Sequence, residues 1–114
     1  MAGYYQTAIN RVFNLVFSSP DNISSTSSTW TNADTYIRYT GSANGTMILP
    51  TAIGYTGQLL FVKNTTAYTY TLTPQTGQTI DGASNLVIGA YSSCTLISVL
   101  VSGSAGGCNW ETLA

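Results

Sequence analysis

The chain has 114 residues, 44% of them hydrophobic, yet it contains only three Lys or Arg, four Asp or Glu and no His. A net charge of −1 gives no electrostatic footprint for nucleic acid, and no apolar run approaches the ~20 residues that span a bilayer. We therefore expect one globular domain with neither nucleic acid nor a membrane as its partner. The abundance of Thr, Val, Ile and Tyr favours β-sheet.

Residues 4–17 form an amphipathic segment. On a helical wheel the apolar side chains gather on one face, whereas Gln6, Asn10 and Asn14 lie on the opposite face. This pattern favours a helix, although the aromatic and β-branched residues leave a strand open as the alternative. Such a face suits contact with a neighbouring subunit or a capsid, so the candidate assembly contacts are Tyr5, Ile9, Val12, Phe13 and Val16, together with Trp30 farther along the chain.

Residues 18–34, SSPDNISSTSSTWTNAD, are rich in Ser, Thr and Asn and include a Pro. This composition is typical of a loop or linker, and Trp30 in its middle is expected to pin the segment onto something. The predicted organisation is an N-terminal attachment arm and linker over 1–33, followed by a β-sandwich domain over 34–114.

From residue 35 onward, short β-type segments alternate with turn residues. We predict strands at 35–40, 45–49, 58–63, 67–73, 78–80, 85–89, 93–101 and 108–113. Eight short strands at intervals of roughly ten residues predict a small antiparallel β-sandwich of jelly-roll type, with a small barrel as the alternative. The segment 58–63 is apolar on both faces, so it should be central in a sheet or lie under another subunit.

The two cysteines belong to the last two predicted strands. A hairpin over 93–113 places Val101 opposite Cys108 and leaves Cys94 seven residues back along its strand, about 23 Å away. A disulfide requires Cα atoms within about 7 Å, so we expect two separate, buried thiols.

Several short motifs occur in a characteristic order. A strand ends in Leu49-Pro50, Gly57 precedes a strand that ends in Lys63-Asn64, and an Ile80-Asp81-Gly82 turn and a terminal Asn109-Trp110 strand follow. In this order the chain resembles a domain recurrent in bacteriophage virion proteins of the head-fibre, tail-fibre and capsid-decoration type. The resemblance covers about residues 36–114, and the loop SGSAGG is longer than the corresponding turn of the family. It implies a β-sandwich that commonly assembles as a trimer.

Groups that could carry catalysis are scarce. There is no His to activate a serine, so acid–base work would fall on carboxylates, Lys63 or tyrosines, and the four acidic residues are isolated in sequence. Asp81 has a structural explanation, because Asp81-Gly82 suits a tight turn in which Gly tolerates positive φ and Asp bonds to nearby backbone. A metal site needs clustered ligands, which the sequence does not offer. We predict no catalytic residues, no metal, no cofactor and no enzymatic activity.

Eight Tyr and two Trp exceed the number that a core of this size requires. These side chains suit surfaces that are partly apolar and partly wet, first of all subunit interfaces and secondly sugar-binding platforms.

The sequence therefore predicts a structural virion protein of a bacteriophage, made in the host bacterial cytoplasm. A chain of this length has no room for a fibre shaft, so we expect a homotrimeric capsid decoration (cement) protein or a short head-fibre protein. Its partner would be the major capsid protein or another virion protein. The alternative is a receptor-binding fibre tip that recognises host surface polysaccharide.

Overall fold

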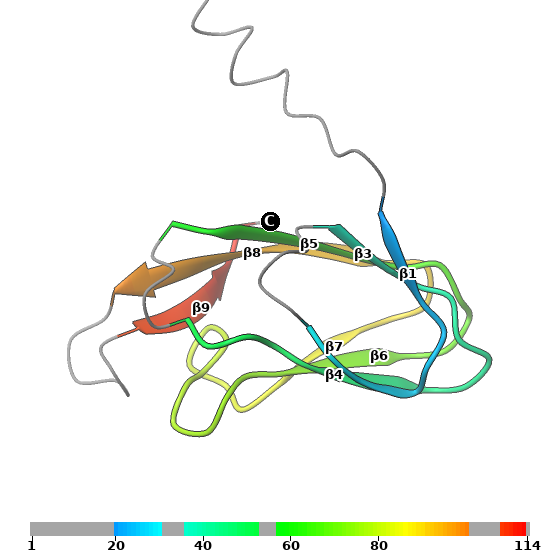
Figure 1. The fold of residues 1–114 in the computed structure, drawn as a ribbon, viewed down its shortest axis with the longest axis horizontal. Helices are drawn as coiled ribbons and strands as arrows, with labels where there is room; N and C mark the ends of the chain where they lie inside the picture. The colour runs from blue at the N-terminus through cyan, green and yellow to red at the C-terminus, as the bar shows by residue number, and fades with distance from the viewer. Residues whose placement is uncertain (1–19, 31–35, 53–56, 101–107, 114) are drawn as a thin grey trace, which may run out of the picture.

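The computed structural model describes residues 20–30, 36–52, 57–100 and 108–113, and these residues contain strands but no helix. The strands are β1 (Asp21–Ile23), β2 (Ser27–Thr29), β3 (Tyr36–Tyr39), β4 (Gly45–Ile48), β5 (Leu59–Asn64), β6 (Tyr70–Thr73), β7 (Leu86–Ile88), β8 (Ser93–Leu100) and β9 (Cys108–Thr112). They form a five-stranded sheet, β1-β3-β5-β8-β9, and a four-stranded sheet, β2-β4-β6-β7, which lie as two layers (Figure 1). The predicted all-β class is confirmed. Over the described ranges there is no helix long and apolar enough to cross a membrane.

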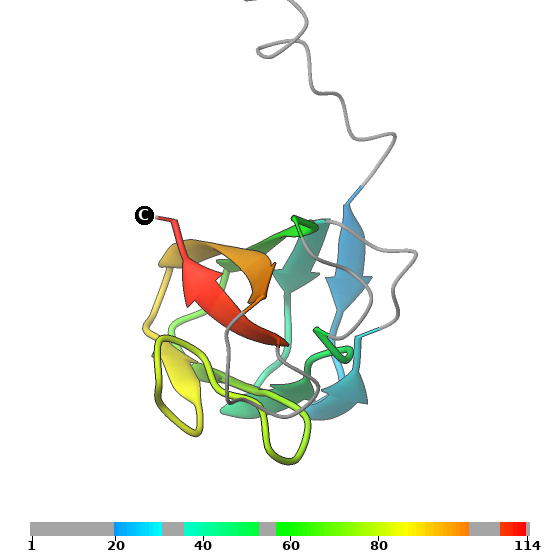
Figure 2. The same ribbon diagram turned by 90° about the vertical axis from the view of Figure 1, so that its left-hand side faces the viewer.

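The two sheets are mixed, which corrects the expected antiparallel, jelly-roll-like arrangement. From β1 to β6 each strand lies in the opposite sheet to the one before it, so the chain winds between the layers (Figures 1 and 2). One full winding returns the chain to the first sheet running in the same direction, and β1, β3 and β5 are therefore parallel, as are β2, β4 and β6. Antiparallel pairing is confined to β5 with β8, β8 with β9 and β6 with β7.

Two successive windings keep the same residue offset in both layers. Tyr36 of β3 pairs with Phe61 of β5, and Gly45 of β4 pairs with Tyr70 of β6, so that the offset is 25 residues in each sheet (61 − 36 and 70 − 45). Because the two offsets are equal, the winding that contains β5 and β6 pairs with the winding that contains β3 and β4 in the same register in both sheets.

One hydrophobic core lies between the layers, and strand alternation explains its composition. In β5 the inward residues Leu60 and Val62 are buried, and in β6 the inward residues Tyr70 and Leu72 are buried. The buried cluster consists of Trp30, Ile37, Tyr39, Met47, Leu49, Ala52, Leu60, Val62, Tyr70, Leu72, Ile80, Ile88, Leu96 and Trp110.

The expected linker over 18–34 contains two strands, so this part of the prediction is wrong. The strand β1 pairs with β3 and β2 pairs with β4, and each is an edge strand of its sheet. Their mostly polar composition, Asp-Asn-Ile in β1 and Ser-Ser-Thr in β2, hid them, because edge strands half exposed to water need few apolar residues. Trp30 follows β2, donates its backbone N–H to the carbonyl of Ile48 at 2.8 Å, and is 3% exposed. Among the described residues the sheets therefore begin at Asp21 rather than at residue 34.

The strands predicted from residue 35 onward agree with the structure, apart from two segments. The segment 78–80 makes only isolated bridges at Ile80, to Ala83 and to Trp110. The strand β6 begins at Tyr70 rather than at residue 67, and Tyr68 lies exposed in the preceding turn. The apolar segment at 58–63 is confirmed as the central strand of the larger sheet.

Candidate functional site

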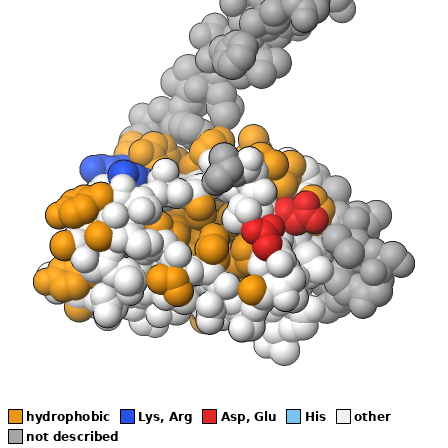
Figure 3. Space-filling view, turned by 180° about the vertical axis from the view of Figure 1, so that it is seen from behind, with side chains coloured by type: hydrophobic (Ala, Val, Ile, Leu, Met, Phe, Trp, Pro, Cys, Tyr) orange, Lys and Arg blue, Asp and Glu red, His pale blue; other side chains and the backbone are white. Residues whose placement is uncertain are grey.

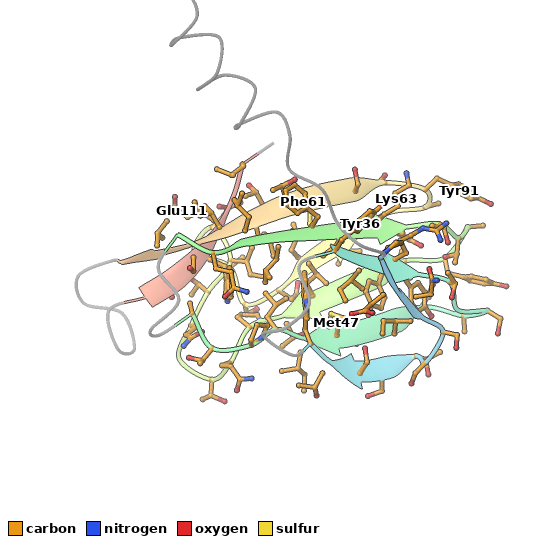
Figure 4. All side chains as sticks on the ribbon, turned by 45° about the horizontal axis from the view of Figure 1, so that its top comes forward. Tyr36, Met47, Phe61, Lys63, Tyr91 and Glu111 are labelled. Atoms are coloured by element: carbon orange, nitrogen blue, oxygen red, sulfur yellow. The ribbon has the colours of Figure 1, made fainter. Side chains whose placement is uncertain are left out.

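The outer side of the five-stranded sheet carries an apolar surface. Strand alternation turns five half-buried side chains outward here, and we call them the apolar face: Tyr36, Leu59, Phe61, Ile97 and Val99. Tyr36 and Phe61 are register partners on β3 and β5, and Leu59 and Ile97 are partners on β5 and β8. Tyr36, Phe61 and Lys63 stand on this layer in Figure 4. A shallow hollow of about 300 Å³ beside the aromatic pair is also lined by Lys63, Ser93 and Thr95.

Charged side chains stand at opposite ends of this sheet. Arg38 and Lys63 are register partners at one end, while Glu111 lies toward the other (Figure 4). In Figure 3 the basic and acidic side chains occupy separate parts of the surface. Arg38 donates to the side-chain oxygen of Asn22 at 3.0 Å, and the Lys63 ammonium donates to the carbonyl of Tyr91. Both cations therefore have partners within the fold.

The outer side of the four-stranded sheet is different in character. Its central strands β4 and β6 present Thr46, Thr71 and Thr73 outward, and Ser27 and Thr29 continue this surface on β2. Hydroxyl side chains of this kind are compatible with water. Apolar side chains also stand among these hydroxyl groups, namely Ile48 with 41% and Val87 with 54% of their surface exposed, so both layers carry apolar residues on their outer sides.

Four turns meet at one end of the molecule, which we call the loop end: residues 24–26, 40–44, 65–69 and 89–92. Each of these turns joins a strand of the five-stranded sheet to a strand of the four-stranded sheet. Two tyrosines project from them, Tyr68 with 44% of its surface exposed and Tyr91 with 62% exposed. Exposed aromatic side chains on neighbouring turns are suited to contact with another molecule.

The buried side chain of Asn64 fixes this end. Its amide nitrogen donates to the carbonyls of Tyr68 at 2.6 Å and Gly89 at 3.0 Å, and its oxygen accepts from the backbone N–H and hydroxyl of Thr66. The backbone N–H of Tyr91 also donates to the carbonyl of Thr66 at 3.0 Å. The turns that carry the two exposed tyrosines are thus tied together. Sequence analysis identified Asn64 only as part of a motif, because its bonds depend on residues far along the chain.

Asp81 and Gly82 form the predicted tight turn. Their φ angles are 51° and 82°, and Ile80 and Ala83 exchange two backbone hydrogen bonds across the turn, as in a two-residue hairpin with positive φ at both positions. The carboxylate does not bond to the turn itself but accepts from the backbone N–H of Thr112 at 3.0 Å and from its hydroxyl at 2.6 Å. Asp81 therefore fastens the turn to β9.

The other motif residues also hold the fold together. The indole N–H of Trp110 donates to the carbonyl of Pro50 at 3.3 Å, and the side-chain oxygen of Asn109 accepts from the backbone N–H of Thr79 at 3.0 Å. Trp110 and Leu49 are fully buried. These residues therefore stabilise the fold, as expected for motifs that indicate a fold rather than a chemical role.

Reactive groups lie apart in the described part of the chain. No three His, Cys, Asp or Glu residues come together there as metal ligands would. Cys94 is a free thiol whose partial burial raises its pKa to about 11, which disfavours the reactive thiolate. Leu100, rather than the expected Val101, pairs with Cys108, so Cys94 lies six residues back along β8, roughly 20 Å away.

The predicted assembly contacts fall into two groups. Tyr5, Ile9, Val12, Phe13 and Val16 lie outside the described residues. Trp30 belongs to the core, where its burial corrects its assignment as an assembly contact and confirms that it anchors its segment. Sequence analysis did not find the pairing of Tyr36 with Phe61, although the two-sided apolar pattern of 58–63 was a signal for an apolar outer surface.

Comparison with known proteins yields no relative: no family model, no curated protein and no solved structure matches this chain.

Proposed function

We propose that this chain is a structural subunit of a bacteriophage particle. In this proposal the two sheets form a β-sandwich that assembles as a homotrimer, and the protein serves as a capsid decoration or short head-fibre protein. The observation that carries the proposal is the loop end, where Asn64 holds two turns in place and Tyr68 and Tyr91 project from them. A rigid, weakly charged surface with exposed aromatic side chains is suited to binding another protein, because little side-chain entropy is lost on contact.

The motif residues support the same proposal. The resemblance to virion domains rests on Leu49-Pro50, Asn64, the Asp81-Gly82 turn and Asn109-Trp110, and these residues supply buried contacts or hydrogen bonds between distant segments. The partner in this proposal is the major capsid protein or another virion protein. Neither catalysis nor a cofactor enters it.

The test is addition of the purified protein to particles that lack it. A decoration protein bridges capsid subunits, so we expect added protein to bind and to raise the resistance of these particles to heat. Changing Tyr68→Asp and Tyr91→Asp together should abolish both effects. The control Ser42→Asp with Ala67→Asp adds the same charge at exposed positions of the loop end and should preserve them. Particles that neither bind the protein nor gain stability would refute a decoration role.

The alternative function is a receptor-binding tip that recognises host surface polysaccharide. The observation in its favour is that Lys63 bonds to the carbonyl of Tyr91, so that a cation lies close to an exposed aromatic residue. Aromatic rings and nearby polar groups are the usual elements of sugar recognition. In this case the protein would bind host cells and compete with infection, and particle stability would not change.

A further inference from the structure

We propose that the outer side of the five-stranded sheet holds a binding site for an acidic sugar, that is, a hydroxylated ring that carries a carboxylate or a phosphate group. The site lies beside the loop end, on β1, β3, β5 and β8. This inference goes beyond the decoration role and does not rest on it, because a single chain away from any particle contains all of the residues involved.

Hydrogen-bond donors form one row across four neighbouring strands, and we call it the donor row: Asn22, Arg38, Lys63 and Ser93. Each of these residues is the register partner of the next, so their side chains share one side of the sheet. That side is the outer one, because the residues on either side of Lys63 in β5 are buried. With strands ~4.8 Å apart, the row is about 14 Å long.

The charges in the donor row favour an anion. Arg38 and Lys63 are two of the three basic residues of the chain, and like charges directly opposite each other destabilise a sheet. Their acceptors, the side-chain oxygen of Asn22 and the carbonyl of Tyr91, are uncharged and leave both positive charges in place. Asp21 precedes the row, but strand alternation turns its side chain to the other side of the sheet. An oxyanion between the two cations would therefore remove their repulsion and accept from their further N–H groups.

The neighbouring row of side chains favours a sugar ring attached to this anion. Tyr36, Phe61 and Thr95 are register partners two residues along the strands, roughly 7 Å from the donor row. The hollow of about 300 Å³ is lined by these three residues and by Lys63 and Ser93, so it joins both rows. Aromatic walls suit the apolar side of a sugar ring, and hydroxyl groups suit its polar edge. Tyr36 and Phe61 serve only as walls, which is compatible with the other interactions of both residues. A hollow at the small end of the usual range for ligand sites has room for a single ring.

Titration of the full chain, followed by nuclear magnetic resonance, tests the proposal with glucuronate and glucose 6-phosphate as probes. We expect the backbone amide signals of Lys63, Ser93 and Thr95 to shift, with a Kd of about 1 mM for the better probe, as is usual for so small a ligand. Tighter binding of glucuronate would identify a carboxylate as the anionic group, and tighter binding of glucose 6-phosphate would identify a phosphate. Glucose lacks the anion and acetate lacks the ring, so each should bind at least about tenfold more weakly.

Variants show whether the donor row is responsible. Arg38→Gln keeps a donor for Asn22 but removes the charge, so it should weaken binding of the better probe by at least about tenfold. Arg38→Lys keeps the charge and should retain most of the binding. Glu111→Gln, which removes a charge toward the other end of the sheet, should change nothing. If Arg38→Gln lacks the β spectrum, sodium chloride added to the native chain gives a second measurement, because it should weaken binding by screening.

Other results would overturn the inference. Signals of Lys63, Ser93 and Thr95 that do not move with either probe would show that no such site exists. Equal binding of glucose would show that the charges are not used, and equal binding of acetate would show simple ion pairing without a sugar site. Equal losses in Arg38→Gln and Glu111→Gln would also contradict the proposal. None of these results affects the test of the decoration role, which depends on Tyr68 and Tyr91.

Discussion

Tyr39 and Tyr70 stack face to face across the core, with ring centroids 4.1 Å apart and ring planes inclined by 12°. Tyr39 comes from the five-stranded sheet and Tyr70 from the four-stranded sheet, so this pair joins the two layers directly. Two glycines lie against the Tyr39 ring. A Cβ atom added at Gly41 would lie 2.2 Å from the Tyr39 hydroxyl oxygen, and one at Gly45 would lie 2.7 Å from the ring carbon Cζ.

Gly45→Ala should therefore destabilise the protein by about 1–3 kcal/mol, because the ring of Tyr39 must move within a packed core. The measurement is urea unfolding followed by circular dichroism. Gly89→Ala is the matched control, since its added Cβ would meet only the Ser92 hydroxyl at 3.9 Å, an ordinary contact. Equal stability of the two variants would mean that the Tyr39 ring is not packed against Gly45.

Asn64→Ala should cost at least about 2 kcal/mol of the free energy of unfolding, because it leaves several buried backbone groups without their partner. Hydrogen exchange should accelerate at the turns 65–69 and 89–92. The control Asn22→Ala removes a single exposed bond to Arg38 and should change stability by less than about 0.5 kcal/mol. Unchanged exchange at both turns would contradict the role of Asn64 at the loop end.

Truncation of the chain tests whether the core needs β1 and β2, as observed, or is complete from residue 34 onward, as the sequence predicted. A fragment of residues 34–114 lacks β1, β2 and Trp30, and we expect it to lose the β spectrum or to aggregate. Within the full chain, Trp30→Ala should cost about 3–5 kcal/mol, as for other buried Trp side chains. A cooperative thermal transition in the 34–114 fragment would show that the core closes without these strands.

Stability should fall at alkaline pH. Burial raises the pKa of Cys94 from its ordinary value near 9.0 to about 11, so the folded thiol stays protonated while the unfolded thiol loses its proton. This contribution to stability is present below pH 9 and is lost as the pH rises toward 11. Burial also raises the pKa of Tyr70, partly opposed by its hydrogen bond to Ser28, and adds a further loss above pH 10.

Urea unfolding at pH 8, 9.5 and 10.5 measures this dependence. Cys94→Ala should flatten the fall between pH 8 and 9.5, whereas the neighbouring exposed change Ser93→Ala should keep it. In the native protein at pH 8, Cys94 should also react slowly with a thiol reagent, and both cysteines should react after denaturation without a reductant. An alkaline profile that is the same in both variants would exclude Cys94 as its source.

The oligomeric state is the most direct test of the proposed assembly. We expect light scattering on the purified full chain to give the mass of a trimer at micromolar concentration. Interfaces would use the exposed large apolar residues, and Tyr68→Asp with Tyr91→Asp reports whether the loop end contributes to the trimer. A stable monomer would refute the homotrimer.

Local patterns predicted much of the fold. The strands from residue 36 onward follow from alternation and from turn residues, and the Asp81-Gly82 turn follows from the φ angles that these two residues tolerate. The direction of strand pairing could not be predicted from these patterns. Parallel and antiparallel strands show the same alternation of side chains, and they differ only in the path of the connections between the layers. The strands β1 and β2 were missed because five of their six side chains are polar. Trp30 was the signal for them, since a lone Trp in a polar segment requires a place in the core.

The equal offset of 25 residues in both layers makes this part of the protein modular. Residues 36–73 form two windings with the same arrangement of strands. A duplicated winding would add one strand to each sheet without changing the pairing of the other strands. Each such addition would lengthen both layers by about 4.8 Å. Within the described residues the sheets end on that side at β1 and β2, which are only three residues long, and Pro20 directly precedes β1. Because a short edge strand offers few free backbone groups to another chain, this side of the two sheets is poorly suited to pairing with a second copy of the protein.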